Sequence, residues 1–145
     1  MVKKRVYFAH SMEGLDIPTE SGRRGRAARE LLGSNFEMLL AEEWQDEVIQ
    51  ENIEEIDLSK LKSSSIILAD LYNIGLRSKE GNHILCQGTN QEIGYAKASG
   101  KYTVVVGRKP KHAHPFDIGK YVDYYTTSLE DACNHIRNTF CEKTN

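Results

Sequence analysis

The sequence lacks long hydrophobic runs and carries no excess of charge of either sign. Its longest apolar stretch, near Ile66 to Ala69, is far shorter than the roughly 20 residues of a membrane span. Val6 to Ala9, which follow the basic start, are too few for a signal peptide. The net charge of −2 argues against binding of a nucleic-acid polymer, because such affinity comes mostly from neutralised phosphates. We therefore expect neither a membrane nor a nucleic-acid partner.

Cysteine and the common catalytic motifs are also scarce. The three cysteines are odd in number and show no metal-ligand spacing, which is typical of reduced thiols in the cytoplasm. No G-x-x-x-x-G-K-[ST] motif is present, and no G-x-G-x-x-G follows the first apolar run, so the usual nucleotide-binding loops are missing. The absence of G-x-S-x-G removes the common serine hydrolase of α/β sheets.

What is present is an alternation of strand and helix patterns in a chain of one-domain length, residues 1–145. The predicted strands are Val6–Ala9, Phe36–Leu40, Ile66–Ala69, Tyr102–Val106 and Tyr121–Thr126. The predicted helices run from Ser21 or Gly22 to Leu32, from Glu47 to Leu61 (with a separate short helix from Asp57 or Ser59 left open), from Thr89 to Ser99, and from Ser128 to Phe140. Continuous apolar strands indicate a parallel sheet covered on both faces. We expect a flavodoxin-like, doubly wound, five-stranded α/β domain with its ligand crevice beyond the carboxyl ends of the strands.

One segment at the start of a predicted helix, Gly88 to Ala96, has two interpretations. Thr89 and Glu92 match a capping box, in which Thr89 is the N-cap and Glu92 its partner three residues later. The same placement puts the Glu92 carboxylate in the first helical turn, where the helix dipole keeps it ionised as a candidate nucleophile or base. Gly94 inside this helix suggests close approach of another group.

The sequence resembles the nucleoside 2-deoxyribosyltransferase family from Val6 to about Ile136. The resemblance depends on Tyr7-Phe8-Ala9, on Ile66 to Leu71, and above all on Gly88-Thr89-Asn90-Gln91-Glu92-Ile93-Gly94-Tyr95-Ala96. It implies that Glu92 attacks the anomeric carbon of a nucleoside and that the sugar passes to another base. It also implies that Tyr7 orients Glu92, although a tyrosine in a strand can equally fill the core.

The resemblance further implies that Gly88, Thr89 and Asn90 shape the sugar pocket. Neither a metal nor an organic cofactor is implied. The implied partner is a small nucleoside or nucleotide, and a second subunit of a homo-oligomer completes the pocket in this family.

The chain departs from the family pattern at two positions. Ser65 stands at the start of the third strand, where an acid assists the leaving base, and Asp70 at the end of that strand either replaces it or caps the loop. Cys86 stands where transferases tend to have Asp and nucleotide hydrolases Ser. Three functions therefore stay open: a base-exchanging transferase, an N-glycosidase that gives the sugar phosphate to water, and a nucleotide-binding protein without turnover.

Basic and polar residues near the first predicted loop favour a phosphorylated substrate. Arg23 and Arg24 open the first helix, where arginines and helix-start N–H groups form a phosphate site, or else a solvated charged surface. By the resemblance, His10 and Ser11 lie nearer the 5′ end of the substrate. His112 and His114 have no further ligands at metal spacing, so no metal site is predicted.

Overall fold

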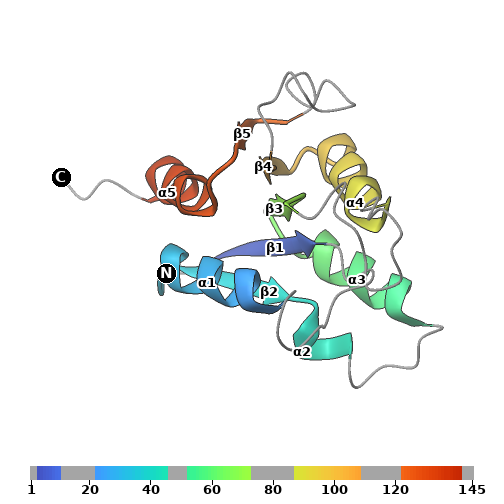
Figure 1. Ribbon diagram of the computed structural model, residues 1–145. Helices are drawn as coiled ribbons and strands as arrows, with labels where there is room; N and C mark the ends of the chain where they lie inside the picture. The colour runs from blue at the N-terminus through green and yellow to red at the C-terminus, as the bar shows by residue number, and fades with distance from the viewer. Residues whose placement is uncertain (1–2, 11–21, 46–51, 73–86, 109–121, 142–145) are drawn as a thin grey trace, which may run out of the picture.

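Five parallel strands form a single sheet in the computed structural model, which describes residues 3–10, 22–45, 52–72, 87–108 and 122–141 (Figure 1). The strands are β1 (Lys4–His10), β2 (Phe36–Leu40), β3 (Ile66–Asp70), β4 (Tyr102–Val106) and β5 (Tyr124–Thr126). Their spatial order is β2-β1-β3-β4-β5 and every neighbouring pair is parallel. This is the order of a flavodoxin-like sheet, so the predicted fold class is confirmed.

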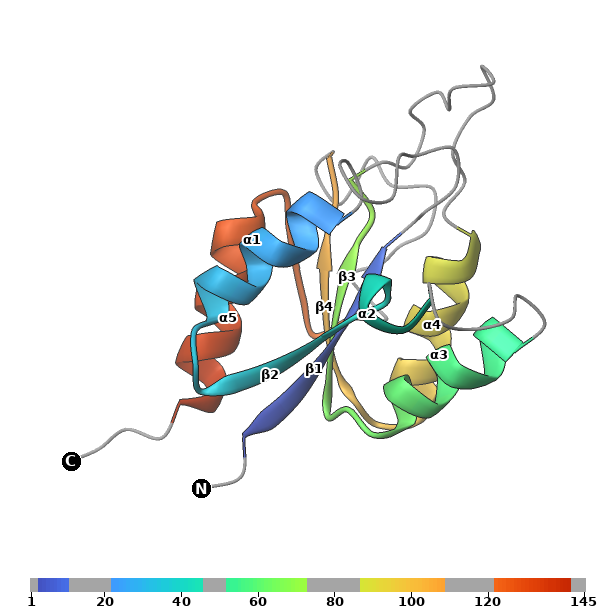
Figure 2. The ribbon, with the colours of Figure 1, turned by 90° about the horizontal axis from the view of Figure 1, so that it is seen from below.

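Helices cover both faces of the sheet (Figure 2). The helices are α1 (Gly22–Leu32), α2 (Glu42–Gln45), α3 (Ile53–Lys62), α4 (Gln87–Ala98) and α5 (Leu129–Phe140). Helices α1 and α5 lie against one face, and α3 and α4 lie against the other. The chain order and the right-handed preference of parallel crossovers make this arrangement the expected one.

Each central strand contributes side chains to two separate apolar layers, because successive residues of a strand point to opposite faces. Val6 and Phe8 pack toward α1 and α5, whereas Tyr7 and Ala9 pack toward α3 and α4. All of β3 is buried, as a strand covered on both faces requires. This alternation decides which polar residues of the strands meet which helix.

Helix α1 approaches the sheet closely at Gly25. A Cβ atom there would lie 2.9 Å from Cδ2 of Leu40 and 3.3 Å from Cδ1 of Phe8, which is closer than side chains normally pack. The glycine therefore allows the helix to sit on β1 and β2. At Gly94 of α4, by contrast, an added Cβ would meet no described atom within 4 Å, so no described part of the chain makes the close approach that the sequence suggested there.

Several predicted boundaries are confirmed and others are not. The bounds of β2 and β4 are as predicted. Gly33 and Gly100 follow their helices with φ of 80° and 75°. Ser128 caps α5, because its side chain accepts a hydrogen bond of 3.1 Å from the backbone N of Asp131. Strand β5 is shorter than predicted, and α2 was not predicted. None of the helices within the described ranges is long and apolar enough to cross a membrane.

Candidate active site

Glu92 lies in the second turn of α4, not at its start. The helix begins at Gln87, so Thr89 is its third residue and the predicted capping box is wrong. No acidic residue occupies the first turn, and the predicted helix-dipole effect on Glu92 therefore does not apply. The Thr89 side chain is buried, and its Oγ1 has no hydrogen-bond partner among the described residues.

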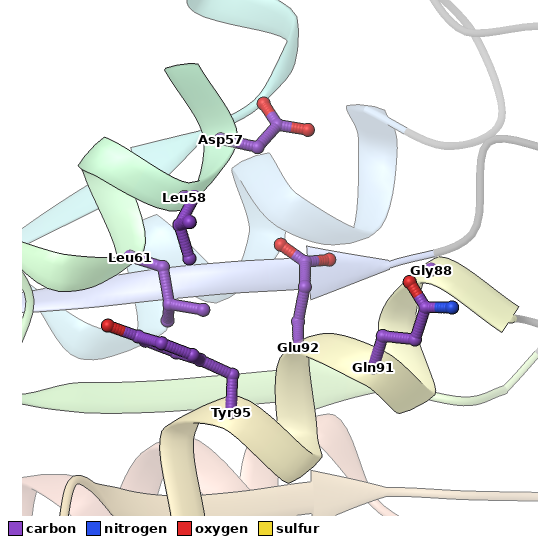
Figure 3. Close-up of a pocket in the computed structure, with 7 residues that line it drawn as sticks. All are labelled: Asp57, Leu58, Leu61, Gly88, Gln91, Glu92 and Tyr95. Carbon is purple, nitrogen blue, oxygen red and sulfur yellow. The ribbon is translucent and has the colours of Figure 1, made fainter. Parts of the chain in front are cut away.

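A pocket of about 300 Å³ opens between α3 and α4. The residues that line it are Asp57, Leu58, Leu61, Gly88, Gln91, Glu92 and Tyr95 (Figure 3). Glu92 points from α4 toward α3, and Asp57 stands on the facing helix. One oxygen of Glu92, Oε2, is buried with no hydrogen-bond partner among the described residues. The pocket therefore combines two carboxyl groups with apolar walls.

Tyr7 approaches Glu92 from the sheet beneath. Tyr7 is 2% exposed, and its side chain is hydrogen-bonded to Glu92. Burial raises the pKa of Glu92 from its ordinary 4.5 to about 7, against the hydrogen bond from Tyr7, which lowers it. Burial and the nearby Glu92 charge raise the pKa of Tyr7, so its hydroxyl remains a proton donor. Near neutral pH, Glu92 exchanges between its charged and neutral forms.

Asp57 is a residue of this site that the sequence did not single out. Its negative charge raises the pKa of Glu92 and that of Tyr7, although both effects are smaller than burial. Its Oδ1 accepts a hydrogen bond of 2.7 Å from Nε1 of Trp44. A signal for Asp57 was available, because it stands four residues before the buried Leu61 and so shares the inward face of α3.

Asp70 lies on the opposite face of the sheet. Its carboxylate forms two hydrogen bonds with Arg24 of α1, at 2.5 Å from Nε and 3.2 Å from Nη2. It also accepts from the backbone N of Tyr72 at 3.1 Å. The structure therefore does not bring Asp70 to Glu92, and it gives Arg24 a carboxylate partner that the phosphate hypothesis had not included.

The other predicted binding residues are spread around the site. Gly88 lines the pocket, and Asn90 lies in the same turn of α4. His10 ends β1 and its ring packs against Phe8, on the α1 side of the sheet, while Arg23 is exposed on α1. Ser11, Cys86, His112 and His114 lie outside the described residues.

Ser65 stands away from this pocket. It is exposed and lines a different hollow, at the amino ends of the strands, together with Lys3, Lys4 and Arg5. An acid in place of Ser65 would therefore not reach Glu92 in this structure. Within the described ranges, no group of three His, Cys, Asp or Glu side chains is arranged to hold a metal ion.

Comparison with known proteins supports the architecture. No protein-family model matches the chain, and no curated protein sequence matches it. Three solved structures superpose on it along nearly their whole length. A conserved protein from Enterococcus faecalis V583 has a TM-score of 0.68 and 16% identity, with 96% of this chain and 100% of that chain covered.

The other two structures carry functional names. A 2-desoxiribosyltransferase from Leishmania mexicana has a TM-score of 0.66 and 20% identity, covering 94% of this chain and 99% of that one. A CMP N-glycosidase from Clostridium botulinum has a TM-score of 0.60 and 14% identity, covering 94% and 100%. At these identities the likeness shows a shared fold.

Proposed function

We propose that this protein cleaves the N-glycosidic bond of a 2-deoxyribonucleoside or its monophosphate and transfers the sugar to another base. The observation that carries the proposal is the pairing of Glu92 and Asp57 across one pocket, with Tyr7 bonded to Glu92 from below. Two of the proteins with the same fold are named as a 2-desoxiribosyltransferase and a CMP N-glycosidase, which supports a substrate with this bond.

In the first step, an ionised Glu92 oxygen attacks the anomeric carbon C1′ as the bond from C1′ to the base nitrogen breaks. The two facing carboxyl groups share one proton, which is on Asp57 when Glu92 is ionised. The bonding electron pair leaves with the base, which takes this proton from Asp57. A carboxylate suits this attack because the departing base leaves an oxocarbenium-like sugar. Burial raises the pKa of Glu92 to about 7, so a large fraction of the group is ionised at neutral pH.

In the second step, the nitrogen of an incoming base attacks C1′ from the face that the first base left. Glu92 departs as a carboxylate, and Asp57 takes back the proton that the incoming nitrogen loses. Two displacements at one carbon give net retention of configuration. Tyr7 would hold the Glu92 carboxylate toward C1′ through its hydroxyl, which burial keeps protonated.

The assignment of the proton donor departs from the one predicted from sequence. Asp70 is held by Arg24 on the far face of the sheet, whereas Asp57 lines the pocket that contains Glu92. We therefore assign proton transfer to Asp57. Gly88 lines the same pocket and Asn90 belongs to the same turn, so we place the sugar along the start of α4.

A nucleotide N-glycosidase is the second candidate, and a cluster at the carboxyl ends of β3 and β4 favours it. The guanidinium carbons of Arg24 and Arg108 lie 4.3 and 6.0 Å from the ring centroid of Tyr72. Positive charge at this edge of the sheet suits a 5′-phosphate. In this alternative, water replaces the incoming base and the product is a free sugar phosphate.

The test is incubation of the purified protein with deoxynucleosides and their monophosphates, with and without a second base, followed by chromatography of the products. A new nucleoside formed only with the second base supports the transferase, and sugar phosphate formed without it supports the hydrolase. Glu92→Gln should abolish both, while Glu37→Gln, an exposed glutamate paired with Arg5, should abolish neither. Calorimetric binding of nucleotides with no product from any substrate would establish a binding protein instead.

A further inference from the structure

Trp44 connects the two side chains that act on Glu92. Its Nε1 donates to Oδ1 of Asp57 at 2.7 Å, and its ring packs against that of Tyr7 with a centroid separation of 6.2 Å and an interplanar angle of 40°. Tyr7 is hydrogen-bonded to Glu92, and the charge of Asp57 raises the pKa of Glu92. One indole in the short helix after β2 therefore contacts both partners of the central carboxyl group.

Helix α3 holds the indole at two points. Asp57 accepts the N–H, and Nζ of Lys60, three residues later on the same helix, lies 5.6 Å from the ring centroid. Tyr7 contacts the ring from the sheet. These contacts restrict the position of the indole from two elements that are far apart in sequence. A side chain restricted in this way gives its hydrogen-bond partner a defined orientation.

The chemistry of the indole determines where a proton on Asp57 resides. An indole N–H is a donor only, so Oδ1 of Asp57 must accept in this contact. When Asp57 is protonated, the proton therefore belongs on Oδ2. A carboxyl group that turned freely would present either oxygen and would lose the alignment that proton transfer needs.

We propose that Trp44 is a positioning residue of the active site: it fixes the Asp57 carboxyl group opposite Glu92 and assigns the transferable proton to Oδ2. The role of Asp57 as proton donor rests on the proposed function. The orientation of Asp57 by Trp44 does not, since it follows from the contacts of these two side chains. The two statements can therefore be tested apart.

The first test uses the fact that Trp44 is the only tryptophan in the chain. A ¹⁵N-labelled sample should give a single indole Nε1–H resonance. We expect this resonance to shift with pH as the Glu92 carboxyl group ionises, and to move and exchange faster with solvent in Asp57→Ala. Asp123→Ala is the matched control, because Asp123 accepts a backbone N–H of Thr103 at 2.8 Å instead of the indole. An indole resonance that is the same in wild type and Asp57→Ala would overturn the proposal.

The second test is kinetic and uses Trp44→Phe, which keeps an aromatic ring and removes the N–H. We expect kcat to fall about ten- to a hundredfold, the worth of a hydrogen bond to a charged group, with KM nearly unchanged. In the Asp57→Ala background the same substitution should cause no further loss, since no carboxyl group remains to be positioned. An equal loss in both backgrounds would contradict positioning and indicate a packing role.

The control for the kinetic test is Tyr102→Phe, which removes a hydroxyl bonded to His135 Nε2 at 2.7 Å on the α5 side of the sheet. It should leave kcat unchanged. If the wild type cleaves no nucleoside at all, the proposed function fails. The indole resonance then decides the positioning role alone, because its response to Asp57→Ala needs no substrate.

Discussion

The side chain of Tyr7 is hydrogen-bonded to Glu92, and the two residues come from opposite layers, the central strand β1 and the covering helix α4. Burial raises the pKa of both groups, but only that of Glu92 to a value near neutrality, about 7. Tyr7 therefore remains a donor over the range in which Glu92 titrates. The pair can respond to pH through the carboxyl group alone.

The activity should depend on the ionisation of Glu92. The reactive pair carries one proton, with Glu92 ionised and Asp57 protonated, so the rate falls as pH rises through about 7 and the pair loses that proton. Replacing Tyr7 by Phe removes the hydrogen bond that lowers the pKa of Glu92, so the falling limb of the pH–rate profile should move to higher pH. At a pH well above this limb, each unit of that movement raises the fraction of the pair that keeps its proton about tenfold. The measurement is kcat/KM from pH 5 to 9 for wild type and Tyr7→Phe.

The control for this profile is Tyr102→Phe, whose hydroxyl contacts His135 on the other side of the sheet. The pH–rate profile of Tyr102→Phe should coincide with that of the wild type. A limb that moves to lower pH in Tyr7→Phe would contradict the role given to Tyr7, because it would mean that the hydroxyl disfavours the carboxylate.

Removing the charge of Asp57 should shift the pKa of Glu92 in the opposite direction. The negative charge of Asp57 raises the pKa of Glu92, so Asp57→Asn lowers that pKa and Glu92 ionises at lower pH. The same variant removes the proposed proton donor, which typically costs about 10²- to 10⁴-fold in rate. The loss should be much smaller for nucleosides with a base that leaves readily without protonation.

The experiment compares kcat and its pH profile for natural and activated substrates. Asp123→Asn serves as control because this carboxylate pairs with Lys97 at the other end of α4. An equal loss for both substrate classes in Asp57→Asn would rule out proton donation by Asp57 to the leaving base.

The sheet and its order were predictable from the sequence, since local patterns were sufficient. Strands β2 and β4 have the bounds that their apolar runs predicted. Gly33 and Gly100 follow their helices in the left-handed conformation, which glycine adopts without strain. Tyr7 and Glu92 were both predicted as site residues, Tyr7 from the resemblance and Glu92 from the resemblance and from its place near the start of a helix. The structure places them in hydrogen-bond contact.

Asp57 and Asp70 could not be assigned from local patterns, because their roles depend on which helix covers which face. Tyr7 pairs in register with Ile67 and shares its face, so Asp70, three residues further on, points to the other face. Asp57 reaches Glu92 only because α3 and α4 cover the same side of the sheet. Such contacts join residues that are distant in sequence, and no single segment contains them.

Glu92 should also make stability depend on pH. A carboxyl group whose pKa is raised on folding favours the folded state below its unfolded pKa, near 4.5, and this contribution is lost as pH rises through about 7. The shift corresponds to about 3 kcal/mol. Glu92→Gln is neutral at every pH, so its free energy of unfolding should exceed that of the wild type more at pH 8.5 than at pH 4.5.

Denaturant unfolding at the two pH values measures this difference. Glu37→Gln, in which the replaced side chain is 46% exposed, should show no comparable change between them. If Glu92→Gln and wild type differ by the same amount at both pH values, Glu92 does not titrate on folding and its burial does not act on its ionisation.

Asp70→Asn should affect stability and leave the chemistry intact. The side chain of Asp70 is 3% exposed and pairs with Arg24, so its replacement leaves a partly buried guanidinium without its charged partner, which costs about 3 kcal/mol. The pH limb of the reaction should stay in place, because Asp70 lies on the face of the sheet opposite Glu92. Unfolding in denaturant and a pH–rate profile at low temperature measure the two effects.

The double variant Arg24→Gln with Asp70→Asn provides the matched control. Removing both charges leaves neither group unpaired, so the double variant should be more stable than Asp70→Asn alone. If Asp70→Asn moved the pH limb or lowered kcat as far as Asp57→Asn does, Asp70 would belong to the reacting groups. The assignment of proton transfer to Asp57 would then be wrong.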